Sequence, residues 1–191
     1  MNERRERFEA VFREVYEPLQ RYARRRTDLA TADDVVADAL LVVWRRLDDL
    51  PPGLALPWCY AIARRCLANR RRGDDRQARV ADRLMGECRD EVIDGDPAID
   101  LALDPALEVA LAQLDVDDRE IVRLWAWEQL PPREIAVVLG ISANAAAIRV
   151  HRAKRRLADL VARATRDQRK DADAAGHEAV GSTRHTTKGA Q

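Results

Sequence analysis

Apolar residues recur every three or four positions along most of the chain, a spacing that predicts helices and not strands. The first stripe comprises Phe8, Val11, Phe12, Val15, Tyr16, Leu19, Tyr22 and Ala23. Pro18 falls inside this stripe. We expect a kink or break just before it, because proline lacks the N–H that a helix interior needs.

Two further helices are predicted in the N-terminal part. One is expected to begin after Thr31, whose hydroxyl can cap a helix, and to end before Pro51. The next is expected to begin near Pro57 and to fray at residues 70–73. Together these segments predict a small helical domain over residues 1–78.

The rest of the chain separates into three segments. Residues 79–103 are rich in Asp and weakly periodic, which predicts a flexible acidic linker with a short helix near Arg79–Glu87. Residues 104–165 predict a second helical domain, and residues 166–191 lose the periodicity and predict a disordered tail. The helices expected in the second domain are Pro105–Leu114, Asp118–Glu128, Pro132–Leu139 and one from Ser142 to about Arg163. The fold class is therefore all-α, with two small helical domains joined by a flexible acidic linker.

The strongest local signal is a helix-turn-helix between residues 132 and 163. Pro132 suits the first turn of a helix, Gly140 suits a sharp turn with positive φ, and Ser142 can cap the next helix. That next helix carries an apolar stripe and a basic opposite face. A short helix, a glycine turn and a longer basic helix are typical of a motif that enters the DNA major groove.

Charge is unevenly distributed, although the formal net charge is zero. Residues 51–80 hold seven Arg against two Asp, and residues 121–166 hold nine Arg or Lys against three acids. Residues 81–120 between them hold three Arg against thirteen acids. Because screening limits electrostatic reach to about 10 Å, a polyanion responds to each basic segment separately.

Other functional classes find little support in the sequence. The longest apolar run, Ala39–Trp44, is too short to span a membrane, and the charged N-terminus lacks a secretory apolar segment, so we expect a cytoplasmic protein. We find no nucleophile–base pair, metal-ligand cluster or glycine-rich phosphate loop, and predict no enzymatic activity, cofactor or metal. Cys59, Cys66 and Cys88 match neither a disulfide framework nor a zinc site and are expected to be thiols.

With both basic segments in view, residues 5–165 resemble the extracytoplasmic-function sigma factors of the sigma-70 family, the bacterial subunits that give RNA polymerase its promoter specificity. Pro132–Leu157 resembles the family's region 4. Ala32–Trp44 resembles region 2.2, and Pro57–Asn69 resembles the promoter-reading helix of regions 2.3 and 2.4. The three segments follow one another in the family's order and spacing.

The resemblance implies core RNA polymerase and promoter DNA as partners. Asp34 and Asp38 would meet a basic surface of the polymerase's largest subunit, and their spacing puts them on one helix face. The residues implied to contact the −10 element are Arg64, Arg65, Asn69, Arg70, Arg71 and Arg72. Those expected to contact the −35 element are Ser142, Asn144, Ala147, Ile148, Arg149, His151, Arg152, Lys154 and Arg155.

The resemblance also raises an anti-sigma factor as a partner, since relatives are often controlled in that way. A stand-alone helix-turn-helix regulator is the alternative function. It would need a dimerisation element or an effector pocket, of which the sequence gives no sign, and it would leave the basic segment at residues 57–72 unexplained.

Overall fold

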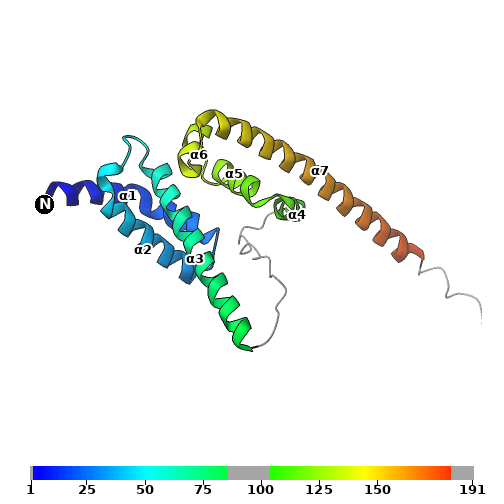
Figure 1. Ribbon diagram of the computed structural model, residues 1–191. Coiled ribbons are helices and arrows are strands. Elements are labelled where there is room, and N and C mark those ends of the chain that lie inside the picture. The colour runs from blue at the N-terminus through cyan, green and yellow to red at the C-terminus, as the bar shows by residue number, and fades with distance from the viewer. Residues whose placement is uncertain (1, 86–103, 182–191) are drawn as a thin grey trace, which may run out of the picture. The chain divides into compact units, whose positions relative to one another are not determined.

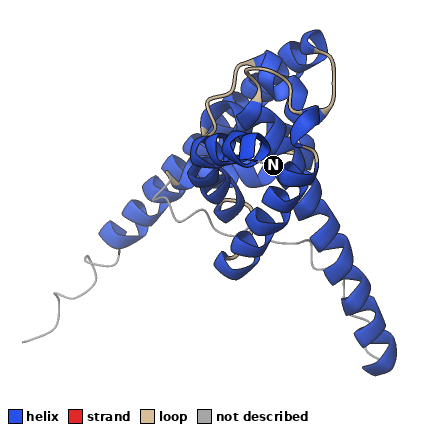
Figure 2. Cartoon of the chain, turned by 90° about the vertical axis from the view of Figure 1, so that its left-hand side faces the viewer, coloured by secondary structure: helices blue, strands red, loops and turns tan. Residues whose placement is uncertain are grey.

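The computed structural model describes residues 2–85 and 104–181, and every regular element within these ranges is a helix (Figures 1 and 2). In chain order they are α1 (Asn2–Arg24), α2 (Leu29–Arg45), the 3-10 turn η1 (Leu47–Asp49), α3 (Ala55–Met85), α4 (Pro105–Gln113), α5 (Val116–Ala126), α6 (Pro132–Leu139) and α7 (Ala143–Gly181). The all-α prediction is confirmed.

The backbone groups these helices into two compact units. One unit combines α1, α2, α3 and α6 with the adjoining ends of α5 and α7. The other combines α4 with the remainder of α5 and α7. Within the described ranges, no single helix is both long enough and apolar enough to cross a membrane.

The apolar faces of α1, α2 and α3 form the core of the first unit. Val15 and Leu19 of α1, which belong to the predicted stripe, are fully buried, and so is Val43 of α2. Tyr22 of α1 stacks on Tyr60 of α3 with ring centroids 4.7 Å apart. Burial of each large apolar side chain contributes about 1.5–3 kcal/mol, so this core holds the first half of α3 firmly in place.

Two helix boundaries in this bundle differ from the expected ones. Helix α1 runs from Asn2 to Arg24, so of the kink or break expected at Pro18 the break does not occur. Helix α2 begins at Leu29, and its cap is Asp28, whose carboxylate accepts a hydrogen bond of 3.0 Å from the backbone N–H of Thr31. Asp28 is as good a capping residue as threonine. Capping by Asp28 lengthens α2 by about one turn at its N-terminus.

Helices α3 and α7 are longer than expected. Helix α3 continues to Met85, through residues 79–85 of the predicted linker and past the fraying expected at residues 70–73. Helix α7 continues to Gly181, so the tail is helical over residues 166–181, which the sequence predicted to be disordered. Both extensions are rich in Ala, Arg and other good helix formers and contain no proline, so an established helix propagates without an apolar stripe.

A buried ion-pair cluster lies in the first unit, at the turn that follows α5. The Glu128 side chain is 2% exposed and pairs with the guanidinium groups of Arg25 and Arg26, the latter at 3.2 Å. The hydroxyl of Tyr60 donates to the same carboxylate at 3.4 Å. Burial, and then the Glu128 charge, raise the pKa of Tyr60, so its hydroxyl stays protonated and remains a donor.

In the second unit, the side chain of Arg119 connects α5 to the end of α4. The guanidinium of Arg119 donates to the backbone carbonyls of Leu111, Ala112 and Leu114 at 2.9–3.0 Å. These carbonyls belong to the last turn of α4 and the residues after it, where a helix leaves acceptors unpaired. Arg119 therefore satisfies them and fixes the start of α5 against α4.

Candidate nucleic-acid interface

Helices α6 and α7 form the helix-turn-helix that the sequence predicts. Pro132 begins α6, and Gly140 follows its last residue with φ 66° and ψ 37°. The N–H of Gly140 donates to Val137 and the N–H of Ile141 donates to Ala136, the bond pattern of a Schellman turn. The chain turns through 105° between the two helices. The predicted positive φ at Gly140 is confirmed.

Helix α7 separates cleanly into a packed face and an exposed face. Ala146, Val150 and Ala153 are buried, as the predicted apolar stripe requires. Ser142 caps the helix, because its hydroxyl accepts from the N–H of Ala145 at 3.2 Å. All the side chains expected to contact the −35 element are exposed, namely Ser142, Asn144, Ala147, Ile148, Arg149, His151, Arg152, Lys154 and Arg155.

Ile148 is the apolar member of this exposed face, with 44% of its surface open to solvent. An exposed large aliphatic residue among cations suits contact with the thymine methyl group in a major groove. Arg149, His151 and Arg152 follow it in the sequence and supply hydrogen-bond donors. The face therefore combines apolar contact with charged donors.

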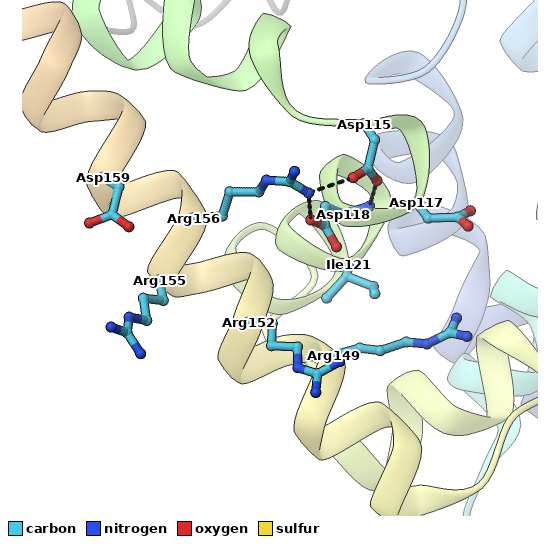
Figure 3. Close-up of a pocket in the computed structure, with 9 residues that line it drawn as sticks. All are labelled: Asp115, Asp117, Asp118, Ile121, Arg149, Arg152, Arg155, Arg156 and Asp159. Carbon is cyan, nitrogen blue, oxygen red and sulfur yellow. Dashed lines mark hydrogen bonds and ion pairs between the residues drawn. The ribbon is translucent and has the colours of Figure 1, made fainter.

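An open groove of about 640 Å³ separates the first turn of α5 from the middle of α7 (Figure 3). Its lining residues are Asp115, Asp117, Asp118, Ile121, Arg149, Arg152, Arg155, Arg156 and Asp159. Arg156 points across the groove to Asp115 and Asp118, at 2.9 and 3.0 Å (Figure 3). The groove thus borders the exposed basic face at Arg149 and Arg152. The ion pairs of Arg156 cross it.

The basic residues of α3 have several different environments. Arg65, Asn69, Arg71 and Arg72 are exposed, while Arg64 and Arg70 are half-buried. Some of these side chains already have partners within the chain. The guanidinium of Arg72 donates to the Asn69 side-chain oxygen at 2.6 Å, and that of Arg71 donates to the Arg26 carbonyl at 3.0 Å. The α3 set is therefore only partly directed toward solvent.

The two carboxylates expected to meet the polymerase lie together on the exposed face of α2. Asp34 and Asp38 have side chains 63% and 58% exposed. Arg70 of α3 lies between them, 3.0 Å from Asp34 and 3.8 Å from Asp38. Arg70, which is expected to contact the −10 element, therefore pairs with the two carboxylates that are expected to contact polymerase. The sequence did not predict this pairing.

Sequence reasoning missed two exposed apolar residues of α2, of which Leu41 shares the face of the two carboxylates and Trp44 lies to the side of it. Leu41 is 54% exposed and Trp44 is 39% exposed. Leu41 follows Asp34 and Asp38 at the spacing that keeps residues on one helix face, whereas the buried stripe lies at Val36 and Val43. That offset from the buried stripe is the signal that would have found Leu41. The Trp44 ring packs edge-on against Phe8 of α1, with centroids 5.1 Å apart, and the Arg4 guanidinium lies 5.4 Å from its centroid.

Metal and thiol chemistry is weakly represented in the part of the chain that the structure describes. No group of three or more His, Cys, Asp or Glu side chains there could hold a metal ion. Cys59 is buried, and desolvation together with the Glu14 charge raises its pKa to about 12, so the thiol stays protonated. Cys66 is half-buried, and desolvation together with the Asp38 charge raises its pKa. Cys88 lies outside the described residues.

Comparison with known families finds two matches, one for each basic segment. Residues 11–77 match the family model described as Sigma-70 region 2. Residues 105–157 match the model described as Sigma-70, region 4. The two matched ranges contain the first parts of α3 and α7 respectively, which carry the basic residues described above.

Two curated relatives are named as RNA polymerase sigma factors. CnrH of Cupriavidus metallidurans is 31% identical over 142 residues, covering 68% of this chain and 72% of the relative. NccH of Alcaligenes xylosoxydans xylosoxydans is 32% identical over 138 residues, with the same coverage of 68% and 72%.

Two solved structures share the fold. The sigma factor RpoE of Bartonella quintana, in complex with the anti-sigma factor NepR, has a TM-score of 0.58 and 26% identity, covering 81% of this chain and 96% of that one. CnrH in complex with the cytosolic domain of CnrY has a TM-score of 0.51 and 25% identity, covering 81% and 86%.

Proposed function

The chain belongs to the extracytoplasmic-function sigma factors of the sigma-70 family, and we propose how its residues divide the work of that family. It is a sigma factor, which binds core RNA polymerase and directs it to promoters to initiate transcription. Sigma factors act as non-enzymatic initiation factors. A stand-alone regulator is not favoured, because the match to region 2 accounts for the first half of the chain.

The functional division proposed is a region 2 domain at residues 1–78, an acidic linker at 79–103, a region 4 domain at 104–165 and a tail at 166–191. The ranges matched by the two family models, 11–77 and 105–157, support the first and third of these. Most of the linker lies outside the described residues. Because RNA polymerase acts in the cytoplasm, we place this sigma factor there as well.

The exposed face of α7 is proposed to read the −35 element, and its exposure along the whole predicted set is the observation that carries this proposal. Ala147 and Ile148 pack against thymine methyl groups, since neither can donate a hydrogen bond. His151 and Arg152 supply the polar base contacts. The remaining polar residues, Ser142, Asn144, Arg149, Lys154 and Arg155, chiefly hold the phosphate backbone, which fixes the register of the helix.

Substitution Arg152→Ala in the full chain, assembled with core polymerase, tests this assignment. We expect the loss of about 1–3 kcal/mol of binding on the preferred −35 sequence and a flatter base preference at one position. Arg155→Ala is the matched control, which should weaken all sequences equally and reduce the dependence on salt. Equal loss on every −35 sequence for Arg152→Ala would instead make Arg152 a phosphate contact.

The first half of α3 is proposed to contact the −10 element through Arg64, Arg65, Asn69, Arg70, Arg71 and Arg72. Guanidinium groups pair with phosphates and stack on unpaired bases, and an Asn side chain can bond a base edge. Arg65 and Asn69 are exposed. Arg70, Arg71 and Arg72 already bond partners in this chain, so their contacts to DNA require those bonds to be exchanged.

The exposed face of α2 is proposed to bind core polymerase. Asp34 and Asp38 supply negative charge for a basic surface, and Leu41 and Trp44 add apolar area one to two turns further along the helix. An apolar centre bordered by charges is the composition of a specific protein interface. Arg70 already pairs with one oxygen of each carboxylate, so a basic surface of polymerase competes with it for both.

An anti-sigma factor is proposed as a further partner. The relatives RpoE and CnrH are each found in a complex of this kind, with NepR and with the cytosolic domain of CnrY. The likeness to both structures extends over 81% of this chain. A binding partner of this kind would be recovered by copurification with the full chain and would compete with core polymerase for it.

A further inference from the structure

Arg156 lies on the α7 surface, and its guanidinium pairs with two carboxylates of the same chain. The same nitrogen, Nη1, donates to Oδ2 of Asp115 at 2.9 Å and to Oδ2 of Asp118 at 3.0 Å (Figure 3). The hydrogen bond to Asp118, together with both carboxylate charges, raises the pKa of Arg156. Among the residues drawn in Figure 3, Arg155 points away from these carboxylates.

The two carboxylates sit where α5 begins. Asp115 precedes the helix, and its Oδ1 accepts from the backbone N–H of Asp118 at 2.8 Å. One carboxylate therefore caps α5 and holds Arg156 at the same time. One residue beyond Asp118, Arg119 bonds the carbonyls at the end of α4. Arg156 thus connects α7 to a helix start that is itself anchored.

The packed face of α7 carries mostly small side chains in this region. Its buried residues there are Ala146, Val150 and Ala153, and both alanines have a single methyl group as side chain. Small side chains allow close approach but give few steric features that resist a shift along or about the helix axis. A guanidinium held by two carboxylates fixes both, because hydrogen bonds weaken steeply when distance or angle changes.

This connection lies one helical turn from the expected base contact. Arg149, Arg152 and Arg156 are spaced three and four residues apart, so they share one face of α7, and all three line the same groove. A rotation of α7 that breaks the bonds of Arg156 would move Arg152 with it. Base readout requires hydrogen-bond geometry, which a displacement of about 1 Å is enough to lose.

We propose that Arg156 is a positioning residue of the −35 reader, which together with Asp115 and Asp118 sets the rotation and axial position of α7 on α5. The inference rests on the proposed role of α7 at the −35 element. Arg156 itself makes no DNA contact in this arrangement. It differs in this from Arg155, which is proposed to hold a phosphate.

Substitution Asp118→Asn provides the sharpest test, because an effect of local charge and an effect on the position of α7 predict opposite changes in DNA binding. Removal of a negative charge beside the basic face should strengthen binding to DNA if only the local field matters. We expect weaker binding instead, by about threefold on the preferred −35 sequence, since an exposed ion pair has a modest effect. Holoenzyme assembled from core polymerase and the full-length variant is measured by competition between promoters that differ only in the −35 element.

Salt dependence separates positioning from phosphate contact. Loss of one phosphate contact reduces the slope of log K against log salt by about 0.9. We expect Arg156→Ala to leave this slope unchanged while it broadens the base preference, and Arg155→Ala to reduce the slope while it keeps the preference. Arg156→Lys should restore part of the preference, because an ammonium can bond one of the two carboxylates.

The measurements are corrected for the active fraction of each variant, because a general loss of folding lowers that fraction and leaves base preference and salt slope unchanged. Tighter binding by Asp118→Asn, or a lower slope for Arg156→Ala, would overturn the proposal. The proposed −35 function of α7 fails instead if Arg152→Ala does not change promoter binding and if the wild type binds promoters with altered −35 sequences equally well. The two failures are therefore distinguishable.

Discussion

Replacement of Gly140 by alanine would add one methyl group at the turn between α6 and α7. Gly140 has φ 66°, and a Cβ built at this position meets no atom within 4 Å. The added methyl group therefore causes no clash with the surroundings, and its effect comes from the backbone alone. The left-handed conformation costs an L-residue about 1–2 kcal/mol.

Gly73 provides a matched control in the same compact unit. It lies inside α3, and a Cβ built there also meets no atom within 4 Å. At both positions alanine restricts the unfolded chain, which stabilises the folded state by about 0.4–1 kcal/mol. The expected net result is a loss of roughly 1 kcal/mol for Gly140→Ala and a gain of about 0.5–1 kcal/mol for Gly73→Ala.

Urea unfolding followed by far-UV circular dichroism measures both changes from the midpoint and the m-value. An unchanged m-value would show that the variants unfold the same surface as the wild type. The reasoning is refuted if Gly140→Ala is as stabilising as Gly73→Ala, because the two substitutions add the same atom in equally open space. Binding to the −35 element should weaken only in Gly140→Ala, since this turn sets the angle of α7.

Two further substitutions test the buried and the exposed charges. Glu128→Ala should cost about 3 kcal/mol of stability in urea unfolding, because it leaves Arg25 and Arg26 buried without their carboxylate, whereas Glu17→Ala removes an exposed pair and should cost no more than about 0.5 kcal/mol. Similar losses for both would contradict this. The hydrogen bond from the backbone N–H of Thr31 lowers the pKa of Asp28 from its usual 3.8, so its contribution is present above that pH and disappears as pH falls through the lowered value. Asp28→Asn, which keeps a capping side chain, should abolish that part of the acid dependence of the melting temperature, and an unchanged acid dependence would show that Asp28 is not its source.

The helix-turn-helix illustrates what local sequence can predict. Each of its three signals is a preference of a single residue: Pro132 for the start of a helix, Gly140 for a positive φ and Ser142 for a cap position. The exposed set on α7 follows from the 3.6-residue period once the buried stripe is known. The candidate −35 residues could therefore be predicted from the sequence, and each of them is exposed in the structure.

Local signals were less reliable where the helix ends depend on competing choices. The cap of α2 is Asp28 and not Thr31. Either side chain can accept the capping hydrogen bond, and capping by Asp28 gives the longer helix. Pro18 does not break α1, whose flanking residues Val15 and Leu19 are fully buried. Burial of apolar side chains on both sides of the proline offsets its lost hydrogen bond of about 3 kcal/mol.

By itself, the sequence determined the all-helical class, the turn of the helix-turn-helix and the residues on the outer face of α7, because each depends on neighbours within a few positions. Only the tertiary structure decided which charges pair. Arg156 meets Asp115 and Asp118, Arg70 meets Asp34, and Glu128 meets Arg26, over separations of 36 to 102 residues. The sequence alone does not show which arginine pairs with which carboxylate, and only the packing of helices distinguishes an arginine that is held by a carboxylate from one that faces solvent.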